Sequence, residues 1–272
     1  MPKKIQLVIS DIDGTLITSN HEVTEATKKT AAALYEAGLA LTLSSSRPPR
    51  SIKPLAEELQ LRSPFASFNG ALITTIDGEI KLRSTINAEI IGHIKSIADR
   101  FGIHVWLYDE NGWWAENRNA FVEREAHTSG FEPELQGYAE RLKESVVKLT
   151  VVGKPELVAQ AEKQILAELG DKVSASRSKP RFLDVTSYGY HKGSVVEHLA
   201  GVFNVSKDEI AVIGDGPNDI EMFKQAGTSI AMGQGVDEVI NNATFITSSN
   251  DDEGWSRGIE KYVLQANQAS AQ

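Results

Sequence analysis

The sequence predicts an α/β fold in which a Rossmann-like parallel sheet carries an inserted α+β domain. Near-continuous apolar segments alternate with helical patterns at both ends of the chain, which is typical of strands covered on both faces. Between these regions, short strands follow one another across glycine-containing turns, which is typical of antiparallel pairing. We therefore expect one domain made of residues 1–83 and 189–272, with residues 84–188 inserted as a second domain.

The N-terminal region supplies the first strands and helices. The pattern predicts strands at residues 5–10 and 39–43, and helices at residues 24–37 and about 50–60. Thr24 is a suitable N-cap for the first helix, and Gly38 suits the position just past its last turn. A third strand at residues 65–68 ends in the turn signal Asn69-Gly70, and a hairpin of residues 71–75 and 79–83 follows.

The middle of the chain changes character. The predicted elements are, in order, a helix at 88–101, a hairpin of 104–109 and 113–116, a helix at 119–127, a strand at 146–152, a helix at 155–169, and strands at 172–176 and 181–186. Strands that are neighbours in sequence favour an antiparallel sheet with its helices on one face.

From Lys192 the alternation of helix and strand resumes. We expect helices at 192–203, 218–226, 236–241 and 254–264, and strands at 210–213, 229–231 and 244–246. The small, polar tail ANQASAQ is expected to fray.

The composition of the chain argues against several classes of function. The chain of 272 residues has a net charge of −9, which argues against nucleic acid or an anionic membrane as the main partner. It contains no cysteine, so disulfides, thiolate metal sites and a thiol nucleophile are excluded. No apolar run reaches the ~20 residues of a membrane span, and the N-terminus lacks the apolar core of a signal peptide. We therefore expect a cytoplasmic protein; its oligomeric state is not readable.

Polar side chains gather where the predicted parallel strands end, which is where ligands bind in such sheets. They are Asp11 and Asp13 after the first strand, Ser44–Arg47 after the second, Asn69 after the third, and Asp215 and Asp219 after strand 210–213, with Lys192 opening a helix. Two like charges 4 Å apart repel by ~4 kcal/mol at an effective dielectric near 20, so the four aspartates need a divalent cation or protons. Ligation by oxygen alone suits Mg²⁺, and the added lysine and serine fit phosphoryl transfer.

Four motifs occur in a fixed order: DIDGT at residues 11–15, a strand-end serine, a lysine before a helix, and GDGPND at residues 214–219. Together they resemble the haloacid dehalogenase-like (HAD) phosphatases, and the long insertion resembles the type IIB cap of the Cof-type branch. Each motif alone is weak, whereas four in order, spread over the whole chain, are specific.

This resemblance implies a role for each residue. Asp11 would be the nucleophile, and Asp13 the general acid and then the base. Asp11, the backbone carbonyl of Asp13, and Asp215 would ligate Mg²⁺, while Ser45 and Lys192 would hold phosphoryl oxygens. The remaining residues would support the site: Asp219 the metal or Lys192, and Asn69, Gly70 and Asn218 the phosphate.

One position departs from the pattern of the branch. Thr-Gly-Arg is usual after the second strand, and this chain has Ser45-Ser46-Arg47. The hydroxyl is retained, but Ser46 adds a side chain where glycine is usual. Of the three serines at 44–46, we favour Ser45 as the one that points into the site.

The inserted domain offers weaker signals. His104, Trp106 and Tyr108 share one face of a strand, opposite Val105 and Leu107. This aromatic face either contacts the organic part of a substrate, or packs within the domain or against a second copy of the chain in a dimer. For Arg177, Lys179 and Arg181, a solvated basic edge is favoured over contact with anionic groups of a ligand.

The sequence thus predicts a Mg²⁺-dependent phosphatase that hydrolyses small phosphorylated metabolites, such as sugar phosphates, through an aspartyl-phosphate intermediate. Two alternatives stay open: a phosphomutase that uses the same aspartate, and a non-catalytic phospho-sensing module resembling a receiver domain. The sequence does not name the substrate.

Overall fold

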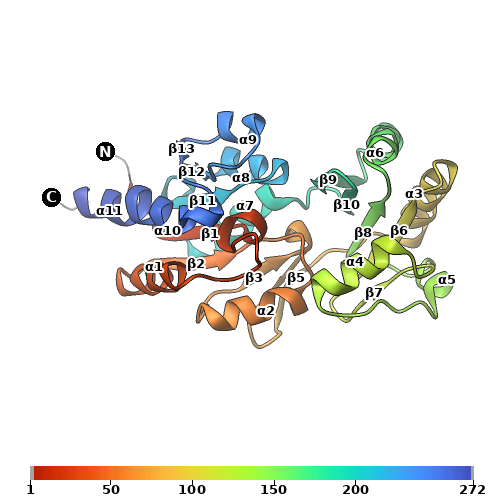
Figure 1. Cartoon of the computed structure of the whole chain (residues 1–272), viewed down its shortest axis with the longest axis horizontal. Coiled ribbons are helices and arrows are strands. Elements are labelled where there is room, and N and C mark those ends of the chain that lie inside the picture. The colour runs from red at the N-terminus through yellow and green to blue at the C-terminus, as the bar shows by residue number, and fades with distance from the viewer. Residues whose placement is uncertain (1–2, 271–272) are drawn as a thin grey trace.

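Five parallel strands form the central sheet, and a computed structural model describes residues 3–270 around it (Figure 1). The strands are β1 (Leu7–Ser10), β2 (Ala40–Leu43), β11 (Ile210–Gly214), β12 (Thr228–Ala231) and β13 (Phe245–Ile246). Their order is β13-β12-β11-β1-β2, so β1 from the N-terminal part pairs directly with β11 from the C-terminal part. The predicted α/β class with a parallel sheet is confirmed, and the carboxyl ends of β1 and β11 are brought side by side.

Helices cover both faces of this sheet. One face packs against α1 (Glu25–Glu36), α2 (Pro49–Glu58) and α10 (Gly254–Ile259), and the other against α7 (Lys192–Phe203), α8 (Ile220–Gln225) and α9 (Asp237–Asn241). Because side chains of a strand alternate, Val8 lies in the first apolar cluster, and Leu7 and Ile9 lie in the second. Burial on both sides explains why the first strand shows no polar alternation.

The third predicted strand lies outside the central sheet. β3 (Phe65–Ser67), β4 (Leu72–Thr74) and β5 (Ile80–Arg83) form a separate antiparallel sheet. A single parallel bridge, between Ser44 and Ala66, connects β3 to the chain just after β2. This bridge still places the turn after β3 next to the end of β2.

The middle of the chain forms a second antiparallel sheet of order β7-β6-β8-β10-β9. Its strands are β6 (His104–Tyr108), β7 (Trp113–Trp114), β8 (Lys148–Val152), β9 (Val173–Lys179) and β10 (Phe182–Ser187). Helices α3 (Ala88–Arg100) and α6 (Pro155–Leu169) pack on one face of it, while α4 (Ala120–Ser129) and the short α5 (Tyr138–Arg141) lie between β7 and β8 in the chain. We call this half of the molecule the cap; Figure 1 shows it beside the central sheet. The exact domain boundaries stay a prediction.

The C-terminal tail is more ordered than expected. The last helix continues past residue 264 through α11 (Gln265–Ala269), and Asn267 exchanges two 2.8 Å hydrogen bonds with the backbone of Ile5. Residues 271–272 of the predicted frayed tail lie outside the described part. Within residues 3–270, no helix is both long and apolar enough to cross a membrane; the cytoplasmic location stays a prediction.

Candidate active site

The turn after β1 places two aspartates at the edge of the central sheet. The N–H of Asp11 donates to the carbonyl of Ile213 at 3.0 Å, which extends the pairing of β1 with β11 by one residue. Gly14 then adopts a φ of +76°, which lets the chain turn sharply beside Asp215. The pair in DIDGT is therefore held at the junction of strands from both ends of the chain.

Lys192 connects three parts of the chain. Its Nζ lies 2.5 Å from Asp11 Oδ1 and 2.6 Å from Asp219 Oδ1, and only 2% of its side chain is exposed. It is the first residue of α7, where His191 caps the helix by accepting from the N–H of Gly193. The helix start therefore fixes the direction from which the ammonium group enters the site.

The loop after β11 supplies two further carboxylates. Asp219 is fully buried, and its Oδ2 accepts from the N–H groups of Asp215 and Gly216 at 3.1 and 2.9 Å. Asp215 Oδ1 accepts from the hydroxyl of Thr15 at 3.2 Å. Asp219 thus folds the GDGPND loop and holds Lys192, while Asp215 is left facing the turn after β1.

The crowding of negative charge in this cluster shifts the pKa values of its members. Burial, with repulsion from Asp219, raises the pKa of Asp11 well above its usual value even though Lys192 opposes the shift. The same two causes raise the pKa of Asp215 to about 6. Burial alone would lower the pKa of Lys192, but Asp11 and Asp219 outweigh it and raise that pKa. The carboxylates therefore need more positive charge than Lys192 supplies.

A divalent metal ion fits this cluster. One carboxylate oxygen from each of Asp11, Asp215 and Asp219 lies within 4.8 Å of the others. The donor set contains oxygen only, which suits Mg²⁺. Because Asp219 already binds Lys192 and two backbone N–H groups, Asp11 and Asp215 are the side chains best placed to ligate the ion.

Asp13 sits in a different environment from Asp11. Its two carboxylate oxygens accept from Nε and Nη2 of Arg47, both at 2.7 Å. Burial alone would raise the pKa of Asp13, but the hydrogen bonds and charge of Arg47 outweigh it and hold that pKa below its usual value. Sequence reasoning assigned no role to Arg47, although it noted the arginine at this position.

The three serines after β2 are separated by the structure. Ser45 is buried and accepts from the N–H of Arg47 at 3.2 Å, and both Ser45 and Ser46 line the cavity described below. Ser44 does not line it. The structure thus separates Ser44 from the other two, the choice of Ser45 over Ser46 stays a prediction, and the side chain of Ser46 is accommodated at the cavity wall.

The residues expected near the phosphate are only partly brought together. Asn218 lines the cavity, and its Nδ2 lies 3.5 Å from Asn69 Oδ1. Asn69 is buried behind it and donates its N–H to the carbonyl of Ser45. Gly70 lies away from the cavity, since a Cβ there would meet Val195 of α7. Gly70 therefore serves close packing rather than direct contact.

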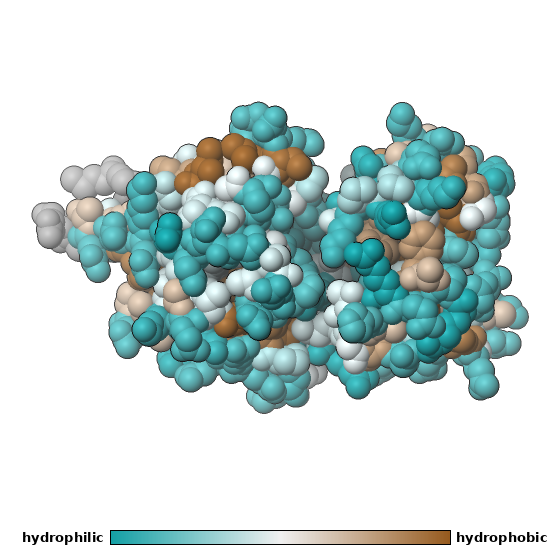
Figure 2. All heavy atoms as spheres, in the orientation of Figure 1, coloured by the Kyte–Doolittle hydropathy of each residue, from teal (hydrophilic) through white to brown (hydrophobic). Residues whose placement is uncertain are grey.

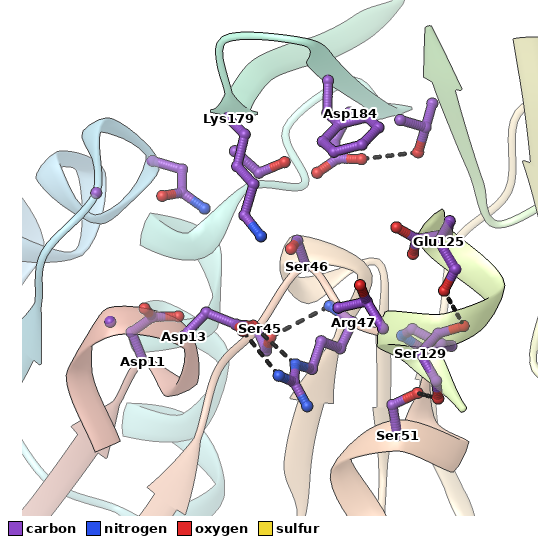
Figure 3. Close-up of a pocket in the computed structure, with 18 of the residues that line it drawn as sticks. Asp11, Asp13, Ser45, Ser46, Arg47, Ser51, Glu125, Ser129, Lys179 and Asp184 are labelled. Atoms are coloured by element: carbon purple, nitrogen blue, oxygen red, sulfur yellow. Dashed lines mark hydrogen bonds and ion pairs between the residues drawn. The ribbon is translucent and has the colours of Figure 1, made fainter. Parts of the chain in front are cut away.

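A cavity of about 400 Å³ opens between the central domain and the cap. Its floor contains Asp11, Asp13, Lys192 and Asp215, and its opposite wall comes from the cap. Figure 3 shows Lys179 and Asp184 of the cap facing Ser46 and Arg47 across this space. The space-filling view in Figure 2 shows the surface hollowed between the two halves.

The face of the cap sheet that lines the cavity is the predicted aromatic face. Val105 and Leu107 lie in the apolar cluster formed with α3 and α6, so the opposite face of β6 is free to meet the central domain. Trp106 and Tyr108 line the cavity, whereas His104 does not and instead lies near Phe121.

The sequence did not predict several other cap residues of this wall as site residues. Lys148, Asp184 and Glu125 line the cavity, although their positions in β8, β10 and α4 carry no motif. Lys179 lines it as well, contrary to the favoured solvated edge, whereas Arg177 pairs with Glu162. For Lys148 and Asp184, alternation along β8 and β10 was the only signal available, because both lie on the cavity-facing side of their strands.

The family of this chain is clear from its similarity to known proteins. Residues 8–259 match the haloacid dehalogenase-like hydrolase family over most of the chain. The chain belongs to this family. A haloacid dehalogenase-like hydrolase from Bacteroides thetaiotaomicron has a similar structure, with a TM-score of 0.84 and 28% identity over 95% of this chain and 100% of that one.

Two further relatives place this HAD hydrolase among phosphatases. The 5-amino-6-(5-phospho-D-ribitylamino)uracil phosphatase YitU of Bacillus subtilis is 26% identical over 96% of this chain and 99% of its own length. A solved HAD subclass IIB sugar phosphatase shares the fold, with a TM-score of 0.84 and 23% identity over 94% of this chain and 98% of that one. The chain is a HAD-type phosphatase with a type IIB cap, and the receiver-like alternative is set aside.

Proposed function

We propose that this enzyme is a Mg²⁺-dependent phosphatase that hydrolyses small phosphomonoesters, such as sugar phosphates, through an aspartyl-phosphate on Asp11. The observation that carries the proposal is the buried group of Asp11, Asp215, Asp219 and Lys192 at the floor of a cavity. The Bacillus subtilis relative, named for a phosphorylated ribitylamino-uracil, supports a small phosphorylated metabolite as substrate.

The floor residues divide the chemistry between them. Asp11 and Asp215 would hold Mg²⁺, whose charge would offset that of the carboxylates and of the phosphate. Lys192 and the Ser45 hydroxyl bind phosphoryl oxygens. Asp11 attacks phosphorus, so that an O–P bond forms as the bond to the leaving alcohol breaks.

Asp13 moves the protons. It gives a proton to the departing alcohol, and then takes one from the water whose oxygen attacks phosphorus, which releases phosphate and restores Asp11. The pairing of Asp13 with Arg47 favours the ionised carboxylate and so suits the second step, because a base must be deprotonated. The first step requires Asp13 to leave Arg47 and bind a proton.

Hydrolysis of 4-nitrophenyl phosphate with Mg²⁺ tests the proposal. We expect Asp11→Asn to abolish phosphate release, while thermal melting shows that the variant is folded. Asp109→Asn is the matched control, because Asp109 is an equally buried aspartate of the cap that does not line the cavity. Acid quenching of the wild-type reaction should trap one phosphoryl group on Asp11, detected by mass spectrometry.

Two outcomes would contradict the proposal. Activity of Asp11→Asn near the wild-type rate would show that the nucleophile is elsewhere. Conversion of one sugar phosphate into its isomer without release of phosphate would indicate a phosphomutase instead.

A further inference from the structure

A strained turn lies directly behind the loop of residues 44–47, which we call the serine loop. The turn follows β3 and consists of Phe68–Gly70, and we call it the left-handed turn. Phe68 and Asn69 have φ values of +52° and +54°. A bulky side chain rarely adopts this conformation, because its Cβ crowds the following carbonyl oxygen. Such strain persists only where the surrounding structure enforces it, and it gathers at functional sites.

The left-handed turn holds the serine loop through two backbone hydrogen bonds. The N–H of Asn69 donates to the carbonyl of Ser45 at 2.9 Å, and the N–H of Phe68 donates to the carbonyl of Arg47 at 3.2 Å. Successive residues of an extended strand alternate in direction, so two consecutive N–H groups reach the same loop only because the chain is not extended here. The unusual conformation at Phe68 therefore fixes the backbone of the serine loop.

The same turn also touches the helix that carries Lys192. A Cβ on Gly70 would lie 3.2 Å from the carbonyl oxygen of His191, the residue that caps α7. The turn and the start of α7 are thus in close contact. Ser45 and Lys192, which hold phosphoryl oxygens in the proposed mechanism, are therefore both placed against one turn.

The side chain of Phe68 packs into the cap. Phe68 is fully buried, and it belongs to the same apolar cluster as Trp106 and Tyr108 of the cap. The centre of its ring lies 6.1 Å from that of Tyr108 and 5.6 Å from Lys148 Nζ. One residue thus holds the serine loop with its backbone and contacts the cap with its ring.

Burial of this ring offsets the strain of the turn. Covering an aromatic side chain is among the largest favourable contributions that a single residue makes to a fold. For Phe68 this contribution requires the cap to lie against the central domain, because cap residues provide part of the cover. A cap that moved away would uncover the ring, whereas the backbone strain would remain. The turn would then relax.

We propose that Phe68 is a positioning residue that couples the seating of the cap to the geometry of the serine loop. With the cap seated, the buried ring holds the left-handed turn, and the turn holds Ser45 in place for the phosphoryl group. With the cap open, the turn relaxes and the serine loop loosens. Phe68 does not line the cavity, so it acts through the loop and not on the substrate. The effect on rate rests on the proposed phosphatase function, whereas the coupling itself does not.

Two buried phenylalanines of the same segment give a matched pair of variants. Phe68→Leu removes the ring from the cap. Phe65→Leu makes the same change in β3, where Phe65 is 2% exposed and belongs to an apolar cluster of the central domain alone. Thermal melting checks that both variants are folded. Phe68→Met, which retains more of the volume, replaces Phe68→Leu if the leucine variant does not fold.

Hydrogen exchange measured by mass spectrometry tests the coupling directly. We expect Phe68→Leu to speed exchange in the serine loop about tenfold or more relative to exchange in β11, because the loop opens locally. Phe65→Leu should leave this ratio at its wild-type value. Loss of a core side chain that acted only through global unfolding would speed exchange in β11 as well, and the ratio would not change.

Hydrolysis of 4-nitrophenyl phosphate with Mg²⁺ tests the effect on rate. We expect Phe68→Leu to lower kcat/KM about tenfold or more, because a small displacement of a positioned group is costly. The inhibition constant of orthovanadate, which mimics the five-coordinate transition state, should rise by a similar factor. Phe65→Leu should keep both values near those of the wild type.

The outcomes separate the inference from the proposed function. An unchanged exchange ratio in Phe68→Leu, or equal kinetic losses in Phe68→Leu and Phe65→Leu, would overturn the inference and leave the phosphatase intact. Failure of the wild type to hydrolyse any phosphomonoester would overturn the phosphatase function. Faster exchange of the serine loop in Phe68→Leu would even then support the coupling between cap and loop.

Discussion

At the scale of single residues, Asp11 and Asp13 look alike in the sequence, but their surroundings in the folded protein differ. Asp11 lies in a buried cluster of negative charge that raises its pKa, while Asp13 is paired with Arg47, which lowers its pKa. Their spacing of two residues does not reveal this, because both side chains follow the same strand. The difference comes from partners 34 or more positions away in the chain.

Asp215 should control the response of the enzyme to Mg²⁺. Mg²⁺ that binds only the folded protein stabilises it, by about 2.7 kcal/mol at a concentration 100 times its Kd. We expect Mg²⁺ to raise the Tm of the wild type, and Asp215→Asn to lose most of this increase, because a ligating carboxylate is removed. Thermal melts of both proteins with and without Mg²⁺ measure this increase in Tm. An undiminished increase in Asp215→Asn, matching that of Asp109→Asn, would exclude Asp215 as a ligand.

Glu125 should make stability depend on pH. Burial raises its pKa in the folded protein above the usual ~4.3, so the folded state binds this proton more tightly than the unfolded chain. The resulting stabilisation is present below about pH 4 and is lost as pH rises through the folded pKa.

Comparison with Glu125→Gln isolates this effect. The variant should melt at a higher temperature than the wild type at about pH 7, and the difference should shrink toward about pH 4. Melting curves of both proteins over this pH series provide the measurement. A difference that is constant with pH would show that Glu125 does not titrate as burial requires.

At the scale of elements, local signals located most helices and strands. Thr24 caps α1 by accepting from the N–H of Thr27, and α7 spans the predicted residues 192–203. Errors arose where contacts distant in sequence decide the outcome. The tail is helical because Asn267 bonds to Ile5, and β3 leaves the central sheet because it pairs with β4.

The turn at Gly14 offers a test at this scale. Gly14 and Gly38 have nearly equal φ values, +76° and +77°. A Cβ on Gly14 would collide with Asp215 Oδ2, whereas a Cβ on Gly38 would meet nothing within 4 Å. Gly38→Ala should therefore lose about 1–2 kcal/mol of stability from backbone strain alone and keep its activity.

Gly14→Ala should suffer the same strain and also displace Asp215. We expect loss of most phosphatase activity and of the Mg²⁺-dependent rise in Tm, beyond the stability lost by Gly38→Ala. Activity assays and thermal melts of both variants are the measurement. Equal behaviour of the two variants would mean that the turn accommodates a side chain.

At the scale of the whole molecule, one buried lysine connects the cap to the central domain. Lys148 Nζ donates to the carbonyl of Ser46 at 3.0 Å and pairs with Asp184. Lys148 and Asp184 come from the cap, and Ser46 comes from the loop after β2. This contact holds the cap wall over the cavity floor in the arrangement seen here.

Removal of this lysine should loosen the cap. Lys148→Met leaves Asp184 buried without its partner, which should cost about 3 kcal/mol or more of stability. It should also speed hydrogen exchange at residues 44–47, measured by mass spectrometry. Lys95→Met is the control, because Lys95 lies in the cap and pairs with Asp99 and Glu116 rather than with the central domain. Unchanged exchange at residues 44–47 would show that Lys148 does not secure the cap.

The sequence by itself determined the parallel α/β core, the inserted antiparallel domain and the main residues of the site floor. It could do so because strand and helix periods are local, and because the motif residues stand at strand ends that parallel pairing brings together. Only the tertiary structure decided the Arg47–Asp13 pair, the position of Gly70 and the cap wall of Trp106, Lys148 and Asp184. These depend on how two domains meet, and no local pattern encodes which side chains face each other across a cavity.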